Sequence, residues 1–142
     1  LLLSSAASDV YKRQANEKKD VILLPHIGAS TAQAEENCAV MAVNQITDFL
    51  ETGNIRNSVN FPNVHLKRTT EHRISIINKN VPAMIGQIAT ALGELDLNIA
   101  EMTNVSKGEI AYNLIDIENS VSENSIATLT EIENVINVRL IS

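Results

Sequence analysis

The sequence predicts an α/β strand–helix unit followed by a small α+β domain, in a chain of 142 residues and 15.5 kDa. Three observations predict this class. A short, unbroken apolar run precedes a long stretch in which apolar residues recur every three or four positions. A polar segment, residues 54–71, then interrupts the pattern and is expected to be a linker. From residue 72 to the end, the apolar spacing switches repeatedly between the strand period and the helix period.

The composition narrows the classes of partner. The formal net charge is −6 and no basic stripe is present, so a nucleic-acid partner is not expected. The single cysteine, Cys38, excludes an internal disulfide and a cysteine-cluster metal site, and it fits a reducing compartment. No apolar stretch approaches the ~20 residues that a membrane helix needs. We therefore expect a cytoplasmic protein that binds neither membrane nor metal.

The first residues are expected to play no part in the fold. Residues 1–14 lack an initiator Met and show neither a strand period nor a helix period, so they look like a foreign or disordered prefix. The missing Met also indicates that the chain is a C-terminal fragment of a longer protein. Residues 15–53 are then expected to be a partial Rossmann-like unit, the last strand and helix of a preceding catalytic or nucleotide-binding portion.

This strand and helix can be justified residue by residue. Val21–Leu24 is a short apolar run, which is typical of a strand buried on both faces of a parallel sheet. Ser30 and Gln33 match a capping box at the start of a helix over about 31–52. Gly53 then provides the residue that commonly ends a helix.

The second unit, residues 72–142, contains six predicted elements. Pro82 suits the start of its first helix, Lys107-Gly108 indicates a tight hairpin, and Ser120 with Glu123 matches a second capping box. The elements are a strand at 73–77, a helix at about 82–95, strands at 99–105 and 110–117, a short helix around 126–132, and a strand at 135–141.

This order predicts a ferredoxin-like βαββαβ domain. Two right-handed crossovers around a hairpin give a four-stranded antiparallel sheet with both helices on one face. A domain this small leaves its other sheet face and its edge strands in need of cover. We therefore expect a homo-oligomer in which two such sheets pair.

The loop after the first strand is a candidate catalytic site. It places His26 at the carboxyl end of a buried strand, which is where open α/β sheets bind ligands. A histidine there can act as a general acid or base, and the small Gly28 and Ala29 would let a flat cofactor approach. An isolated histidine at a strand end can equally be a structural cap.

The longer string, LPHIGAST at residues 24–31, resembles the C-terminal signature of the D-2-hydroxyacid dehydrogenases. The later SVNFP, residues 58–62, is similar to the exit from the nucleotide-binding region in the branch that opens serine biosynthesis. The resemblance implies that His26 is the catalytic histidine and that His26, Ile27, Gly28 and Ala29 border the nicotinamide of NAD. The family's catalytic Arg and Glu and its glycine-rich dinucleotide motif lie upstream of this signature, so the chain alone is not expected to catalyse the reaction.

Asparagines mark a second candidate site. Asn78 and Asn80 lie between the first strand and its helix, and Asn98 precedes the next strand. Amide side chains both donate and accept hydrogen bonds, and a helix N-terminus attracts a carboxylate, so together they could hold an amino acid. Asparagine is also common in turns for purely local reasons.

Residues from about 72 onward resemble an ACT domain, the effector-binding module of many enzymes of amino-acid biosynthesis. In the serine-pathway dehydrogenases this domain binds L-serine at a paired interface. The resemblance implies that Asn80 and Asn98 match the two serine-binding asparagines and that Asn78 replaces a serine-binding histidine. Ala83 stands where the family usually has glycine after proline.

The sequence as a whole is interpreted as the C-terminal part of an NAD-dependent dehydrogenase of serine biosynthesis, with a regulatory ACT domain that binds L-serine. Three alternatives stay open. The chain could come from another ACT-tailed D-2-hydroxyacid dehydrogenase, from a free-standing amino-acid-binding module, or from a purely structural dimerisation domain.

Overall fold

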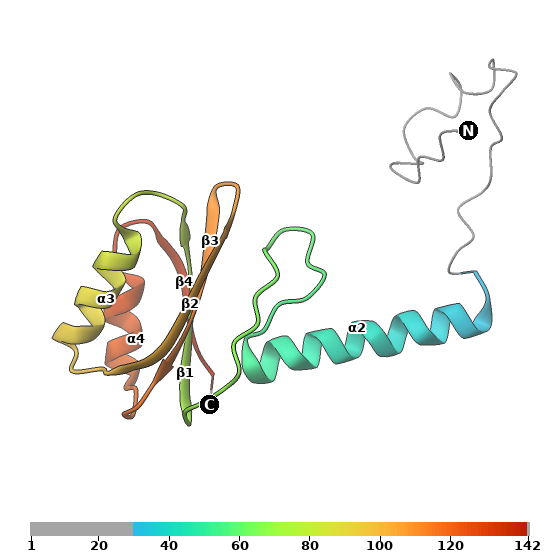
Figure 1. Ribbon diagram of the computed structural model, residues 1–142, viewed down its shortest axis with the longest axis horizontal. Coiled ribbons are helices and arrows are strands. Elements are labelled where there is room, and N and C mark those ends of the chain that lie inside the picture. Colours follow the sequence, from blue (N-terminus) through green and yellow to red (C-terminus); the bar gives the residue numbers. More distant parts are fainter. Residues whose placement is uncertain (1–29, 142) are drawn as a thin grey trace, which may run out of the picture. The chain divides into compact units, whose positions relative to one another are not determined.

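The computed structural model describes residues 30–141. Its elements follow the predicted order (Figure 1). They are the helix α2 (Ala32–Thr52), the strand β1 (His72–Lys79), the helix α3 (Met84–Glu94), the strands β2 (Ile99–Lys107) and β3 (Ile110–Ile117), the helix α4 (Glu123–Thr130) and the strand β4 (Val135–Ile141).

The four strands form one antiparallel sheet in the order β2-β3-β1-β4. Helices α3 and α4 both lie on one face of this sheet (Figure 1). Strand order and helix placement together are those of the ferredoxin-like fold, so the fold predicted for residues 72–142 is confirmed. The hairpin prediction is also confirmed, because Lys107 pairs with Ile110 across a loop of Gly108 and Glu109.

The main core lies between the sheet and these two helices. Isoleucine and leucine dominate it, because each central strand presents every second side chain to the helices. Its fully buried members are Ile74, Ile76, Ile88, Leu92, Ile115, Ile117 and Leu129.

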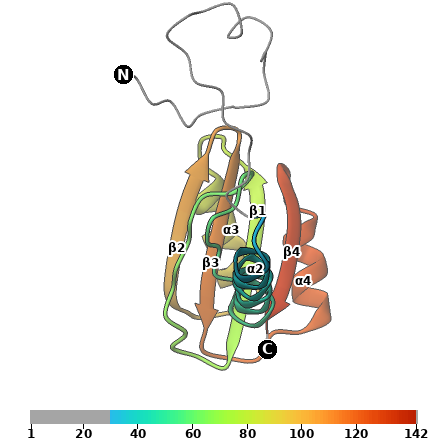
Figure 2. The same cartoon turned by 90° about the vertical axis from the view of Figure 1, so that its right-hand side faces the viewer.

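The opposite face of the sheet is covered by the chain itself. Ile55 and Val64 pair through two backbone hydrogen bonds of 2.8 and 2.9 Å, and with Leu66 they pack on this face. Figures 1 and 2 both show the segment between α2 and β1 lying against the side of the sheet away from α3 and α4. The expectation that a partner copy must cover this face is therefore wrong, because three apolar side chains of the expected linker already occupy it.

The C-terminal end of α2 is held by side chains from three strands. Arg139 donates to the carbonyl of Phe49 at 2.6 Å, and its guanidinium lies over the Phe49 ring. Arg73 donates to the carbonyl of Thr52 at 2.9 Å, and the Tyr112 hydroxyl donates to the carbonyl of Gly53 at 2.8 Å. Arg73 satisfies the carbonyl of Thr52, which the end of the helix leaves without a partner within the helix. Arg139 is a second donor to the carbonyl of Phe49, which also accepts from the amide of Gly53. The two guanidinium charges interact favourably with the negative pole of the helix.

Gly53 has two reasons to be glycine. Its φ of 75° is in the left-handed region, as expected for a residue that ends a helix. A Cβ atom at this position would also lie 2.6 Å from Cδ1 of Ile141 and 2.7 Å from Cδ1 of Leu114. The close approach of α2 to the sheet therefore depends on the missing side chain.

The capping residues of α2 and α4 differ from the predicted ones by one and two positions. Thr31, not Ser30, caps α2 by accepting from the amide of Ala34. Ser122, not Ser120, caps α4 by accepting from the amide of Ser125. In each case a hydroxyl residue one or two positions later caps the helix, although no Glu or Gln stands three residues after it to complete a capping box.

Within residues 30–141, no helix is long and apolar enough to cross a membrane. The same residues contain no group of three or more His, Cys, Asp or Glu side chains that could hold a metal ion.

Candidate functional site

The predicted catalytic loop cannot be placed. His26, Ile27, Gly28 and Ala29, together with the predicted strand at 21–24, lie outside the described residues. Their assignment to catalysis and to NAD therefore stays a prediction.

The asparagine cluster can be placed, and it borders a small cavity where α3 begins. The cavity has a volume of about 150 Å³, which is on the order of the space of five water molecules. None of its lining residues is titratable, so the cavity offers no acid, base or nucleophile. The lining residues are Asn78, Asn80, Val81, Ala83, Met84, Ile85, Gly86, Asn104 and Ala111.

The N-terminus of α3 is open at this cavity. Pro82 does not begin the helix as expected, because it forms a turn with Ala83, which precedes the first helical residue with φ 68° and ψ 0°. No side chain caps the helix. The first-turn amides of Met84, Ile85 and Gly86 have no carbonyl one turn earlier within the helix to bond. They therefore present a partial positive charge that suits a carboxylate.

Asn78 is buried, with 1% of its surface exposed, and it belongs to a chain of amides across the sheet. Its Oδ1 accepts from Nδ2 of Asn113 at 2.7 Å, and its own Nδ2 donates to the carbonyl of Lys79 at 2.7 Å. Asn113 in turn accepts at Oδ1 from Nδ2 of Asn104 at 2.6 Å. One hydrogen-bonded row thus crosses β1, β3 and β2.

Asn80 lies just beyond the end of β1 and is exposed. Its Nδ2 donates to the carbonyl of Gly108 at 3.1 Å, and its backbone amide donates to the carbonyl of Glu109 at 2.8 Å. The β2–β3 hairpin therefore holds Asn80 at the rim of the cavity.

Asn98 lies at the other end of the sheet. Strands β1 and β2 both run antiparallel to β3, so the start of β2 lies beside the start of β1, not beside its end. The eight residues of β1 separate the two ends by about 25 Å. Asn98 instead bonds Glu118 and Asn119. The expectation that all three asparagines meet in one cleft is wrong for a single chain.

Two residues of this cluster were not predicted. Asn104 lies in β2 and Asn113 lies in β3, and neither was singled out from the sequence. A signal was available: a hairpin that pairs Lys107 with Ile110 also pairs Asn104 with Asn113. Applying that register to the sequence would have placed both amides at the end of the sheet that carries Asn78.

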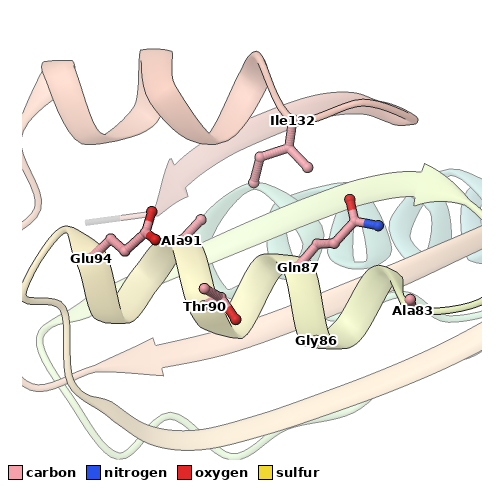
Figure 3. A pocket seen from close by; sticks show the side chains of 7 residues that line it. All are labelled: Ala83, Gly86, Gln87, Thr90, Ala91, Glu94 and Ile132. Atoms are coloured by element: carbon pink, nitrogen blue, oxygen red, sulfur yellow. The ribbon is translucent and has the colours of Figure 1, made fainter.

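A larger hollow of about 450 Å³ lies along the outer side of α3. In Figure 3, Gln87 and Ala91 project from α3 towards Ile132, while Ala83 and Glu94 lie at the two ends of the helix. Its polar groups are spread along the helix and do not converge on one point. We therefore regard the smaller cavity as the better candidate site.

Comparisons with known proteins point to one family. No family model matches the chain. D-3-phosphoglycerate dehydrogenase of Haemophilus influenzae is 32% identical over 126 residues, which cover 88% of this chain and 31% of the relative. D-3-phosphoglycerate dehydrogenase 2 of Saccharomyces cerevisiae is 34% identical over 117 residues, which cover 79% of this chain and 24% of the relative. The chain thus spans about a quarter to a third of the length of these curated relatives.

Solved structures with a similar arrangement include ACT domains. The ACT domain from GTP pyrophosphokinase of Chlorobium tepidum matches with a TM-score of 0.43 and 19% identity, over 49% of this chain and 94% of that one. An ACT domain protein from Streptococcus pneumoniae matches with a TM-score of 0.41 and 15% identity, over 49% of this chain and 84% of that one.

Proposed function

Because this chain is homologous to the D-3-phosphoglycerate dehydrogenases, we propose that its ferredoxin-like domain is the amino-acid-binding regulatory part of an NAD-dependent oxidoreductase of serine biosynthesis. The observation that carries the proposal is the cavity at the start of α3. It combines an uncapped helix N-terminus with three asparagine amides and no titratable side chain. Such a site can bind a small polar molecule but has no group to transform it.

The cavity suits a small amino acid such as L-serine. The first-turn amides of α3 would bind the carboxylate, and the asparagine amides would bind the ammonium and hydroxyl groups. A volume of about 150 Å³ favours a short side chain over an aromatic one. Asn78 and Asn80 are the proposed effector-binding residues of this end of the sheet.

The role proposed for Asn98 requires a second copy of the chain. Strand β2 is an edge strand, so its outer backbone groups can pair with those of another copy. If two β2 strands pair antiparallel, the start of one lies beside the end of the other. Asn98 of the partner subunit would then lie at the end of the sheet that carries Asn80. Pairing through β2 would thus bring Asn80 and Asn98 of the partner subunit to one site.

The catalytic part of the proposal concerns His26, which would exchange the proton of the substrate hydroxyl, with Ile27, Gly28 and Ala29 beside the nicotinamide of NAD. Hydride transfer is the chemistry that NAD supplies when it is bound. Effector binding would alter activity through an energetic coupling between the two distinct sites. The exposed free thiol of Cys38 agrees with the proposed cytoplasmic location.

Isothermal titration calorimetry of the whole 142-residue chain with L-serine tests the binding proposal, with sedimentation velocity run on the same samples. We expect saturable binding and a dimer that L-serine stabilises. Asn80→Leu should weaken binding by tenfold or more, because it removes an amide at the cavity rim. The control Ser106→Ala, on β2 but outside the cavity, should bind normally. The absence of binding at millimolar L-serine and other small amino acids would refute the proposal.

A further inference from the structure

We infer that Oδ1 of Asn104 is the acceptor that binds the ammonium group of the amino-acid effector, and that Asn113 is the residue that orients it. This inference rests on the proposed function and names a specificity determinant within that site. The supporting observation is the order of donors and acceptors along the row of Asn78, Asn113 and Asn104. Hydrogen bonds to two backbone carbonyls fix this order.

The first fixed point is Asn113, which is completely buried. Its Nδ2 donates to the carbonyl of Ile76 at 3.1 Å and to Oδ1 of Asn78 at 2.7 Å. A backbone carbonyl can only accept, so the side of Asn113 that faces Ile76 must be the NH₂ group. Both hydrogens of that group are then used, and Oδ1 of Asn113 must face β2 as an acceptor.

The second fixed point is Asn78. Its Nδ2 donates to the carbonyl of Lys79, so its Oδ1 must be the atom that faces Asn113. The two constraints agree, because an acceptor on Asn78 is what the NH₂ group of Asn113 requires. Reversing either amide would place two donors or two acceptors against each other inside the sheet, at a cost in unsatisfied polar groups.

The fixed direction determines what Asn104 offers to a ligand. Because Oδ1 of Asn113 is an acceptor, Asn104 must present its NH₂ group to it, as the 2.6 Å contact shows. The carbonyl oxygen of Asn104 is therefore directed away from the row, and no described residue donates to it. Asn104 is exposed and lines the cavity, so this oxygen is the acceptor that Asn104 has left for a cationic group bound there.

The cavity is bordered by donors on one element and by this acceptor on another. The start of α3 presents amide donors, whereas Asn104 on β2 presents an oxygen. A ligand with a carboxylate and an ammonium would be bound in one direction only. A ligand that lacks the ammonium would leave the Asn104 oxygen without its partner.

The experiment compares two probes on the whole chain by calorimetry: L-serine and 3-hydroxypropionate, which is the same molecule without its ammonium group. The measured quantity is the ratio of the two affinities. We expect wild type to prefer L-serine by about tenfold or more, as for a hydrogen bond to a charged group. Asn104→Leu should reduce this preference to near unity.

Asn104→Asp separates ammonium binding from a structural role. Both carboxylate oxygens of the aspartate are acceptors, so the side chain offers an acceptor to the cavity without being oriented by Asn113, to which it can no longer donate. We therefore expect Asn104→Asp to retain the preference for L-serine that Asn104→Leu loses. The control Ser106→Ala should behave as wild type, and thermal unfolding of each variant checks that it is folded.

Three results would overturn the inference. If Asn104→Leu keeps the wild-type preference, Asn104 does not bind the ammonium. If Asn104→Asp and Asn104→Leu lose the preference equally, Asn104 acts only through its bond to Asn113. If wild type binds no amino acid at all, the proposed function fails and this inference fails with it, a result that differs from the first two because no binding is seen in any variant.

Discussion

Arg73 and Asp116 form an ion pair in which both side chains are completely buried, with Nη2 of Arg73 2.9 Å from Oδ2 of Asp116. Their remaining hydrogen-bonding groups are also satisfied. Arg73 donates to the carbonyls of Thr52 and Leu66, both at 2.9 Å. Asp116 accepts from the amide and the hydroxyl of Thr69, both at 2.9 Å. The pair therefore ties strands β1 and β3 to the segment that leads out of α2.

Removing one partner of this pair should destabilise the protein strongly. In Asp116→Ala the guanidinium of Arg73 stays buried without its counter-charge, so we expect a loss of about 3–5 kcal/mol in the free energy of unfolding. Urea denaturation measures this loss. The matched control is the surface pair of Arg56 and Asp48, where Arg56→Ala should cost less than about 1 kcal/mol. Equal losses at the two sites would contradict the argument.

The same carboxylate should make stability depend on acid pH. Burial raises the pKa of Asp116, but hydrogen bonds from Arg73 and Thr69 lower it by more, so the pKa lies below its ordinary value of 3.8. A lowered folded-state pKa stabilises the protein above the unfolded-state pKa, and this contribution is lost as the pH falls through the folded-state pKa. We expect the free energy of unfolding to decrease below about pH 4. Asp48, whose pKa is also lowered, adds to the decrease in the same direction.

The check is a series of urea titrations between neutral and acid pH. Asp116→Asn should have a shallower pH dependence than wild type, with the remainder due to Asp48 and other carboxylates. An unchanged slope in Asp116→Asn would show that Asp116 is not the responsible group.

Ala83→Gly should stabilise the protein. Ala83 has a φ of 68°, a left-handed conformation that costs a residue with a Cβ about 1–2 kcal/mol. Glycine removes this cost but makes the unfolded chain more flexible, so we expect a net gain of about 0.5–1 kcal/mol. The control Ala89→Gly, inside α3, should lose about 1 kcal/mol instead. Thermal unfolding of the two variants should therefore shift in opposite directions.

Lys107 should hold the loop that precedes Val64 against the hairpin. Its Nζ donates to the carbonyl of Val59 at 2.8 Å and lies 3.4 Å from that of Ser58. In Lys107→Met these bonds are lost, so hydrogen exchange of backbone amides in residues 57–63 should become faster. Lys79→Met, which removes a lysine at the end of β1, is the control. Exchange rates that remain at the wild-type level in Lys107→Met would exclude this role.

Much of the domain could be predicted because its apolar residues recur at regular strand or helix spacing. Strands β3 and β4 were predicted with their observed bounds and α2 to within a residue, because the apolar spacing continues to the end of each element. The cover on the second sheet face could not be predicted. Ile55, Val64 and Leu66 are isolated apolar residues in a polar segment, and only contact with the sheet reveals that they are buried.

The site was predicted in part. Asn78 and Asn80 border one cavity, because Asn78 lies near the end of β1 and Asn80 directly follows that strand. The prediction placed Asn98 near Asn78 and Asn80 because all three were expected in loops. It did not consider that β1 and β2 run in the same direction, which puts the start of β2 at the opposite end of the sheet from Asn80. Asn104 was missed because a polar residue within a strand gives no local signal, and its position follows only from the hairpin register.

The hydrogen bonds between the sheet and the end of α2 limit where the chain can be truncated. The change in composition near residue 71 suggests a domain boundary there. A fragment that starts at His72 would, however, lack the carbonyls to which Arg73 and Arg139 donate. It would also bare Tyr112, Leu114 and Ile141 to water, an apolar surface prone to aggregation. An excised ferredoxin-like domain that is to stay monodisperse must therefore retain the upstream chain at least from Phe49.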